Sequence, residues 1–292
     1  MDIPKLYKYR YFNENQVSRD GFPGGEIITQ WHQVLYDGLI FPASPKTFND
    51  PFDCEFVLDD SIFNSLFMKE TLIKFLKKQY TVSKGDKDLL RSSDDPEKTF
   101  KEILWRKYRI KYKSDRDGIN KEISTAMQEI KDSLRIACFS ADNLSILMWS
   151  HYAQNHQGFC IEYDLNNSEY AAYIKPVQYT HDRRLVPGNL MDCKEPSPAE
   201  IIREAALCKS SVWSYEQEWR LVTPRIDIAF PEYQGHTEFY PLKNYITSVY
   251  LGAKSNVKYE KEICEHYRGT QVKVYRMQMM SNSYSLETEQ IQ

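Results

Sequence analysis

The sequence lacks the long apolar stretches of membrane and secreted proteins. It has no run of about 18 apolar residues and no apolar segment of the kind that begins a signal peptide. Its six cysteines are scattered without the CxxC spacing of metal or redox motifs, which is typical of reduced thiols. These absences predict a cytoplasmic protein that has no contact with a membrane.

A strong net charge and the common nucleotide and metal motifs are also missing. The formal net charge is -3 at pH 7, so no overall positive field holds a polyanion, and any contact with nucleic acid would be local. The sequence has no P-loop and no GxGxxG fingerprint. His151 and His156 lie outside the i, i+4 spacing of helical metal ligands, and HExxH and EF-hand patterns do not occur. We therefore expect no metal site and no prosthetic group.

Apolar and aromatic residues are plentiful, and they predict a folded α+β protein. Hydrophobic residues make up 41% and charged residues 27% of the chain, proportions typical of globular domains. Alternation of apolar and polar residues predicts strands, and apolar residues spaced three and four apart predict helices. We expect strands at 6–12, 39–42, 136–140, 159–164, 174–180, 212–223, 237–242, 246–251 and 271–279, and helices at 27–37, just after 142 and at 256–267.

The 292 residues are predicted to form a single domain with one helical insertion. The insertion, at about 59–135, is charged and helical in pattern with several breakers, so we expect it to pack beside the sheet. The helix at 256–267 predicts a parallel crossover within a mixed, mostly antiparallel sheet that has flanking helices. The last ten residues are polar and are expected to fray.

The strongest chemical pattern is the run from 213 to 221, which contains Glu216, Glu218 and Arg220. In an extended strand these three side chains point the same way. Like charges raise the pKa of a carboxyl group and an arginine lowers it, so such a trio can hold a protonated acid beside an ionised base. A solvated strand face with an ordinary ion pair is the alternative interpretation.

A second pattern lies between 136 and 164. Ser140 ends a predicted strand, where its hydroxyl can face a cleft, and Tyr152 offers a ring for stacking and a phenol for hydrogen bonding. His151 has the chemistry of a general base. Its helical spacing places it beside Leu147 on an apolar face, however, which favours a histidine in the core or at its boundary.

Three weaker patterns complete the candidates. Lys8 and Arg10 share one face of the first strand and can grip a phosphate or a carboxylate. The turn that holds Asn49 and Asp53 can present polar groups to a ligand, although such residues in turns mostly cap backbone amides. The stretch 101–116 mixes basic and aromatic residues, which is typical either of a surface for RNA or DNA or of a solvated amphipathic helix.

Together these segments resemble a bacterial and phage family, the domain of unknown function 2971. The resemblance covers most of the chain outside the insertion and rests on the segments 6–10, 48–53, 138–140, 148–153, 158–164 and 215–220. Many members look like components of mobile-element or phage-defence neighbourhoods. The resemblance therefore implies a role in phage defence or in a toxin system.

The order of the polar residues is also similar to that in ADP-ribosyltransferases. Those enzymes use a basic or His residue on an early strand, a Ser or Tyr on a second strand, and a late Glu, often in a Glu-x-Glu pair. The late Glu stabilises the oxocarbenium ion as nicotinamide leaves. In this sequence the same order is kept by Lys8 or Arg10, by Ser140 or Tyr152, and by Glu216 with Glu218. Lys8 departs from the pattern, because His or Arg is usual there.

This similarity implies an ADP-ribosyltransferase-like or NAD-cleaving enzyme that works without metal. NAD would be its substrate, and a protein or nucleic acid would be the acceptor. Glu218 would stabilise the ribosyl cation, Glu216 would orient or deprotonate the acceptor, and Tyr152 would act beside them. Substrate binding is expected from Lys8, Tyr9, Arg10, Asn49, Asp53, Ser140, Trp149 and Arg220.

Two other functions stay open. One is a non-catalytic module that senses a ligand or nucleic acid through an aromatic and basic groove. The other is a metal-dependent nuclease that uses Asp50, Asp53, Glu162 and Asp164. The enzyme interpretation makes a geometric prediction: Lys8 and Glu218 should share one site on one sheet, bordered by the loop at 49–53.

Overall fold

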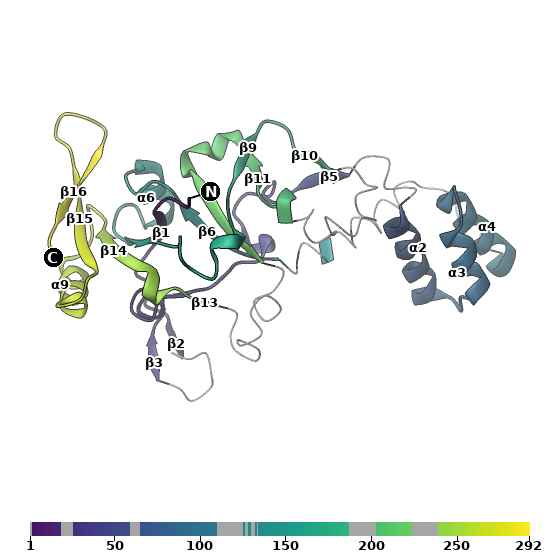
Figure 1. Ribbon diagram of the computed structural model, residues 1–292, viewed down its shortest axis with the longest axis horizontal. Coiled ribbons are helices and arrows are strands. Elements are labelled where there is room, and N and C mark those ends of the chain that lie inside the picture. Colours follow the sequence, from purple (N-terminus) through teal and green to yellow (C-terminus); the bar gives the residue numbers. More distant parts are fainter. Residues whose placement is uncertain are drawn as a thin grey trace. The chain divides into compact units, whose positions relative to one another are not determined.

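Figure 1 shows the computed structural model, which describes residues 2–18, 26–58, 65–109, 125, 128–129, 132, 134–186, 203–223 and 239–292. The chain divides into two compact units. Unit 1 combines Met1–Ser44, Arg135–Tyr179 and Ser211–Gln292, and unit 2 combines Pro45–Leu134 and Thr180–Ser210. Unit 1 contains the main sheet and unit 2 contains a helical bundle, and the single domain expected from the sequence stays a prediction.

Unit 1 is built on an eight-stranded sheet in the order β16-β15-β14-β7-β1-β6-β12-β8. Neighbours run antiparallel except β14 and β15, which run parallel and are separated in sequence by helix α9 (Val257–Tyr267). The strands are β1 Leu6–Arg10, β6 Arg135–Ser140, β7 Phe159–Tyr163, β8 Ile174–Pro176, β12 Glu218–Thr223, β14 Ile246–Leu251, β15 Lys273–Met279 and β16 Leu286–Gln290. The predicted α+β class, with its mixed and mostly antiparallel sheet, is confirmed.

Short elements complete unit 1. Asn256 caps helix α9 by accepting a hydrogen bond from the backbone N–H of Lys258, so this helix begins where the sequence predicts. Strand β4 (Leu39–Ile40) pairs with β13 (Tyr240–Pro241), and strand β9 occupies Gln178–Thr180. The 3-10 helices η3 (Ala171–Tyr173) and η7 (Lys243–Tyr245) precede β8 and β14.

Two segments of unit 1 differ from the sequence predictions. The expected helix at 27–37 is strand β3 (Ile27–Thr29) followed by helix α1 (Gln30–Leu35), because the β-branched start of the segment pairs with β2 (Gln16–Ser18). The expected frayed tail contains β16, which pairs with β15 along its whole length. Polar residues suit that position because β16 is the edge strand of the sheet.

A third difference concerns the predicted strand at 212–223. Residues Ser211–Glu216 form the 3-10 helix η5, and strand β12 begins only at Glu218. Gln217 joins the two elements with a φ of 44°. The chain therefore turns between the two glutamates, and Glu216 does not follow the strand alternation from which its position was predicted.

The two faces of the sheet are covered by two clusters of buried side chains. The first cluster contains Leu6, Phe139, Ile161 and Leu221 of the sheet with Trp31 and Leu35 of α1 and Ile263 of α9. The second contains Tyr9, Cys160, Tyr250 and Met277 of the sheet with Met148 and Trp149 of helix α6 (Ile146–Tyr152). We call these sides of the sheet the α1 face and the α6 face. Because side chains alternate along a strand, every strand contributes to both.

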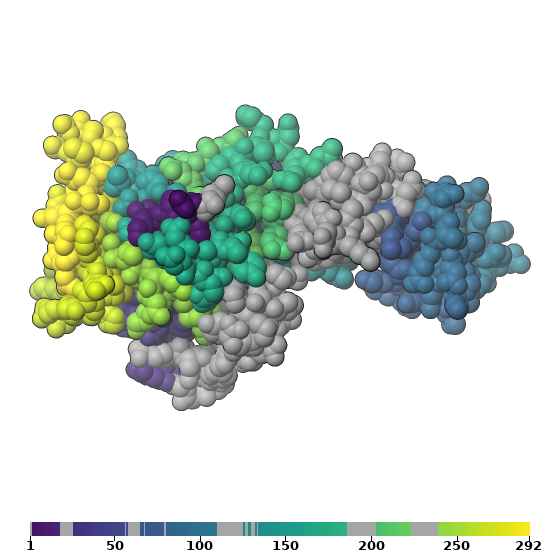
Figure 2. Space-filling model, in the orientation of Figure 1, coloured from purple at the N-terminus to yellow at the C-terminus, as the bar shows by residue number. Residues whose placement is uncertain are grey.

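Unit 2 contains three packed helices and a small parallel ladder. Helices α2 (Leu66–Gln79), α3 (Lys84–Arg91) and α4 (Pro96–Tyr108) pack against one another, and their atoms form one continuous blue body in Figure 2. Ser65, Ser83 and Asp95 cap their N-termini. Strand β5 (Phe56–Leu58) pairs parallel with β10 (Arg184–Val186), and β11 spans Cys208–Ser210. The helices at 66–108 are those that the charged pattern predicts.

Candidate functional site: a buried polar row on the α6 face

Five polar side chains form a row across neighbouring strands. Ser248 on β14 lies opposite Glu162 on β7, which lies opposite Tyr7 on β1. Tyr7 lies opposite Ser140 on β6, and Ser140 lies opposite Glu218 on β12. Residues directly opposite each other point to the same face, so all five point to the α6 face. Tyr7 is half-buried and the other four are buried.

At the β12 end of this polar row, Glu218 and Arg220 form a buried ion pair. The guanidinium of Arg220 donates to both carboxylate oxygens, over 2.8 Å from Nε to Oε1 and 2.9 Å from Nη2 to Oε2. The exposed fraction is 0% for Arg220 and 5% for Glu218. Such a two-point contact fixes the geometry of both groups, and the arginine matches the charge of this carboxylate. The predicted shared face of Glu218 and Arg220 is confirmed.

Glu216 comes to the same region by a different route. It ends η5, and its carboxylate Oε1 accepts a hydrogen bond of 2.7 Å from the phenol of Tyr152 on α6. The hydroxyl of Ser140 donates to the backbone carbonyl of Glu216 over 2.7 Å. Glu216, Tyr152 and Ser140, all predicted site residues, therefore lie together in the fold. The hydroxyl of Ser140, however, binds the backbone of Glu216 rather than facing a cleft.

His151 and Tyr215 lie at the solvent side of this group. His151 is exposed, and its Nδ1 is 3.2 Å from the phenol oxygen of the half-buried Tyr215. The predicted core position of His151 is wrong, because Leu144 and Leu147 on its side are 45% and 46% exposed. Helix α6 is only seven residues long and buries Met148 and its neighbour instead.

Backbone strain concentrates beside these residues. Six described residues other than glycine have a positive φ, and four of them are Gln154, Asn155, His156 and Gln217. The first three follow Tyr152 almost directly, and Gln217 separates Glu216 from Glu218. A left-handed conformation costs such residues roughly 1–2 kcal/mol each, and strain of this kind clusters at functional sites.

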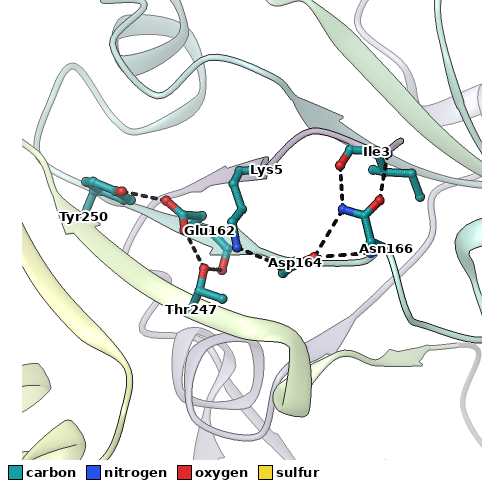
Figure 3. Close-up of polar contacts among 7 residues, drawn as sticks. All are labelled: Ile3, Lys5, Glu162, Asp164, Asn166, Thr247 and Tyr250. Atoms are coloured by element: carbon teal, nitrogen blue, oxygen red, sulfur yellow. Dashed lines mark hydrogen bonds and ion pairs between the residues drawn. The ribbon is translucent and has the colours of Figure 1, made fainter. Parts of the chain in front are cut away.

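Figure 3 shows the other end of the polar row. The carboxylate of Glu162 accepts hydrogen bonds from Thr247 Oγ1 at 2.5 Å and from Tyr250 Oη at 2.7 Å. Burial, together with the neighbouring Glu162 carboxylate, raises the pKa values of Tyr7 and Tyr250. Both phenols therefore stay protonated at neutral pH and can act as hydrogen-bond donors.

The residues beside Glu162 hold the start of β1 against the end of β7. Lys5 Nζ lies 2.9 Å from Asp164 Oδ2, and Asn166 exchanges two hydrogen bonds with the backbone of Ile3 (Figure 3). The Lys5 ammonium holds the pKa of the Asp164 carboxyl below its usual range. Glu162 and Asp164, two of the residues considered for a nuclease, thus have hydroxyl and ammonium partners. Among the described residues, no group of three or more His, Cys, Asp or Glu side chains could hold a metal ion.

Lys8 and Arg10 do not share the face of Glu218. Strands β1 and β12 lie close together in the same sheet, as predicted, and both pair with β6. Lys8, however, lies opposite Ile161 and therefore points to the α1 face. Its ammonium donates to the Cys138 carbonyl and lies over the Phe139 ring. The prediction that basic and acidic side chains meet in one site is wrong, because the register puts Lys8 and Glu218 out of phase.

Tyr9 and Trp149 belong to the core of the α6 face. Trp149 is 0% exposed, donates from Nε1 to the Asn143 carbonyl over 2.7 Å, and contacts the Tyr9 ring edge to face. The Tyr9 phenol donates to the Asp142 carbonyl over 2.6 Å. Neither ring offers a face to a ligand in this arrangement, so their expected role in substrate binding is not supported by their positions.

Asn49 and Asp53 belong to unit 2. Asn49 is exposed, whereas Asp53 is buried and lies 3.5 Å from the ammonium of Lys209. In the same turn, Asp50 accepts a hydrogen bond from the backbone N–H of Phe52 over 2.9 Å, as residues of this type do in turns. The expectation that this loop borders the site on the sheet stays a prediction.

Sequence reasoning missed three partners of the polar row. Tyr250 and Thr247 come from a strand that was predicted without naming polar residues in it. The phenol oxygen of Tyr179 accepts a hydrogen bond of 2.8 Å from the backbone N–H of Glu218. No local motif marks these residues. Thr247 and Tyr250 reach Glu162 only through the register between β14 and β7.

The fold and the site define an α+β protein with a buried acidic and phenolic row on one face of its sheet. Residues 148–221, which include Tyr152, Glu216 and Glu218, match the model of a family described as "Protein of unknown function (DUF2971)". The match confirms the resemblance for residues 148–221, whereas the resembling segments 6–10, 48–53 and 138–140 lie outside the matched residues. Neither the curated proteins nor the solved structures include a significant match to the chain. Within the described residues, no helix is both long and apolar enough to span a membrane.

Proposed function

We propose that the protein is an enzyme that cleaves or transfers the glycosidic bond of a nucleotide, with NAD as the candidate substrate. The observation that carries the proposal is the placement of two glutamates on either side of the strained Gln217. Glu218 is matched by Arg220, and Glu216 is held by the phenol of Tyr152. Two carboxylates in different surroundings are the usual arrangement for glycosidic-bond cleavage.

The reaction needs negative charge close to the ribose. The bond between C1′ and the ring nitrogen of nicotinamide breaks, and its electron pair leaves with nicotinamide. Water or an acceptor nucleophile then bonds to C1′ and releases a proton, so hydrolysis of NAD⁺ yields ADP-ribose, nicotinamide and one H⁺. A carboxylate fixed beside C1′ stabilises the positive charge of the transition state by several kcal/mol.

We assign the charged role to Glu216 rather than to Glu218. Arg220 donates to both oxygens of Glu218, so that carboxylate is occupied in holding the start of β12. The carboxylate of Glu216 accepts a hydrogen bond from Tyr152, which is half-buried and adjacent to the exposed His151. Glu218 and Arg220 then act as positioning residues, because they fix the start of β12.

The cellular role and the acceptor belong to the same proposal. A protein or nucleic acid that approaches the exposed side of α6 would meet His151 and Tyr215 first. A role in phage defence or in a toxin system fits an enzyme that consumes NAD or modifies a partner.

The test is the release of nicotinamide from NAD by the purified full-length chain, with EDTA present. Glu216→Gln keeps the volume of the side chain and removes its charge, so turnover should fall roughly 10²-fold or more. Tyr152→Phe removes one hydrogen bond to the carboxylate and should lower turnover roughly 10-fold. Glu287→Gln on the exposed edge strand β16 is the matched control and should leave turnover unchanged.

Three outcomes would contradict the proposal. Turnover that survives in Glu216→Gln would remove the carboxylate from the mechanism. Turnover abolished by EDTA would favour metal-dependent chemistry. If no NAD were consumed with any acceptor tested, the protein would not catalyse the proposed reaction.

A non-catalytic ligand sensor is the second candidate, and the burial of the glutamates favours it. The exposed fraction is 3% for Glu216 and 5% for Glu218, so both carboxylates are largely withdrawn from solvent. A sensor would bind its ligand at the exposed side, where Tyr215→Ala would weaken binding without any turnover to lose. An enzyme would instead lose turnover in Glu216→Gln while binding persists.

A further inference from the structure

A pocket opens on the α1 face, on the side of the sheet opposite the polar row. Its cavity volume is about 220 Å³. Its walls include Arg10 at the end of β1, Tyr11 and Asn13 just after it, Gln30 and Trp31 of α1, and Phe41. This volume is below the roughly 300–1,000 Å³ of drug-sized sites, so the pocket encloses only part of a larger ligand.

Arg10 is a desolvated cation without a matching anion. Among the described residues its guanidinium makes no hydrogen bond and no ion pair, and burial lowers its pKa. The groups that favour its charge are Tyr163, Cys138 and Tyr11, and no carboxylate is among them. Arg10 is half-buried, and a partly desolvated charge without a counter-charge is unfavourable, so this arrangement favours an anion that enters the pocket.

Trp31 contributes a second donor that lacks an acceptor. Its side chain is 2% exposed, and its Nε1–H has no hydrogen-bond partner in the described part of the chain. A buried donor left unpaired costs about 1–3 kcal/mol. Trp31 and Arg10 line the same pocket, but the Trp31 Nε1 atom has less than 1 Å² of accessible surface. The Arg10 guanidinium is therefore the donor that a ligand with acceptor oxygens would satisfy.

The rest of the pocket suits a planar ring. Tyr11 is 50% exposed and Phe41 is half-buried, so both rings have surface that can pack against a ligand. The side-chain amides of Asn13 and Gln30 are hydrogen-bonded to each other at the same wall. A ligand that fits this pocket would place a ring beside these residues and an anionic group at Arg10. Such a ligand is a compact, charged aromatic molecule.

We propose that this pocket is a binding site for an aromatic anion of the nucleoside monophosphate class. The phosphate oxygens accept from the guanidinium of Arg10, and the base packs against Tyr11 and Phe41. The site is independent of the glycosidic chemistry assigned to Glu216, because Arg10 and Glu218 point to opposite faces of the sheet.

The test is a titration of the full-length protein with AMP, adenosine and inorganic phosphate, followed by calorimetry and by the indole N–H resonances in ¹H–¹⁵N spectra. The Trp31 resonance is identified as the one of five tryptophan signals that is missing in Trp31→Phe. AMP should bind and shift this resonance, because Trp31 lines the pocket. Adenosine and inorganic phosphate should each bind at least roughly 10-fold more weakly, because each lacks one half of the ligand.

Arg10→Met removes the charge and keeps a side chain of similar length. It should weaken AMP binding roughly 10-fold or more, whereas Arg268→Met, an exposed arginine paired with Glu265, should bind like the wild type. Wild-type binding of AMP that leaves the Trp31 resonance unmoved would overturn the proposal, and this readout needs no variant at the pocket. Equal binding of AMP by Arg10→Met, or of adenosine by the wild type, would also overturn it.

Discussion

Two arginines of the same sheet, Arg220 and Arg10, differ in whether a carboxylate pairs with the guanidinium. Arg220 on β12 is fully buried on the α6 face, and both oxygens of Glu218 accept hydrogen bonds from it. Arg10 on β1 points to the α1 face, and within the described chain its guanidinium has no hydrogen-bond or ion-pair partner. Both lose hydration, but only Arg220 gains a counter-charge in return.

This difference separates structural charge from charge that is held for a ligand. A matched pair such as Arg220 and Glu218 fixes the position of neighbouring groups, here the start of β12 and the turn at Gln217. An unmatched cation at a pocket wall adds nothing to the apo protein and favours any anion that can reach it. The Glu218–Arg220 pair is therefore part of the structural frame, and Arg10 belongs to the binding site that we propose on the α1 face.

The largest expected effect comes from breaking the matched pair. Glu218→Ala leaves the guanidinium of Arg220 buried without its carboxylate and should lower the free energy of unfolding by about 3–5 kcal/mol. Urea denaturation measures this loss. The exposed control Glu287→Ala should change the free energy of unfolding by less than about 0.5 kcal/mol.

The double variant Glu218→Ala with Arg220→Met sharpens the comparison. Removing both charges should restore part of the stability lost in the single variant, because no unpaired ion is left. A single variant that loses less than about 1 kcal/mol would contradict the structural role of the pair.

A smaller, pH-dependent effect is expected at Lys8. Burial, followed by the neighbouring charge of Arg10, lowers the pKa of Lys8 to about 7, while Cys138 and Glu218 favour its charged form. Because the folded-state pKa lies below the unfolded value, the cost of burying the ammonium is fully present below pH 7. It fades as the pH rises toward the unfolded value.

Lys8→Met removes this titration. The variant should gain stability relative to the wild type at pH 6, and this difference should shrink by roughly 2 kcal/mol between pH 6 and pH 9. Denaturant unfolding at both pH values measures it, with the exposed Lys5→Met as the control. A difference that is the same at both values would show that Lys8 does not titrate in this range.

Much of the sheet could be predicted from local patterns. The alternation in 159–164 and 246–251 and the capping residue Asn256 gave the positions of β7, β14 and α9, because each depends on neighbours in sequence. Strand β16 was missed because edge strands tolerate polar residues and therefore carry no apolar pattern.

The candidate site was harder to predict, because it depends on register. The Glu-x-Glu-x-Arg pattern correctly predicted that Glu218 and Arg220 share a face, and Tyr152, which was predicted to act with these glutamates, contacts Glu216. The face on which Lys8 and Arg10 lie depends on the pairing of β1 with β6 and β7, and a shift of one residue would reverse it. No local pattern encodes that choice.

The most direct measurement of the central claim compares Arg220→Met and Arg10→Met by urea unfolding without added ligand. Arg220→Met should lose about 3–5 kcal/mol, because it strands Glu218 in the core. Arg10→Met should be as stable as the wild type or more stable, since it removes a desolvated cation that has no partner in the described chain. Equal losses in the two variants would contradict the account, because Arg10 would then be a structural residue rather than one held for a ligand.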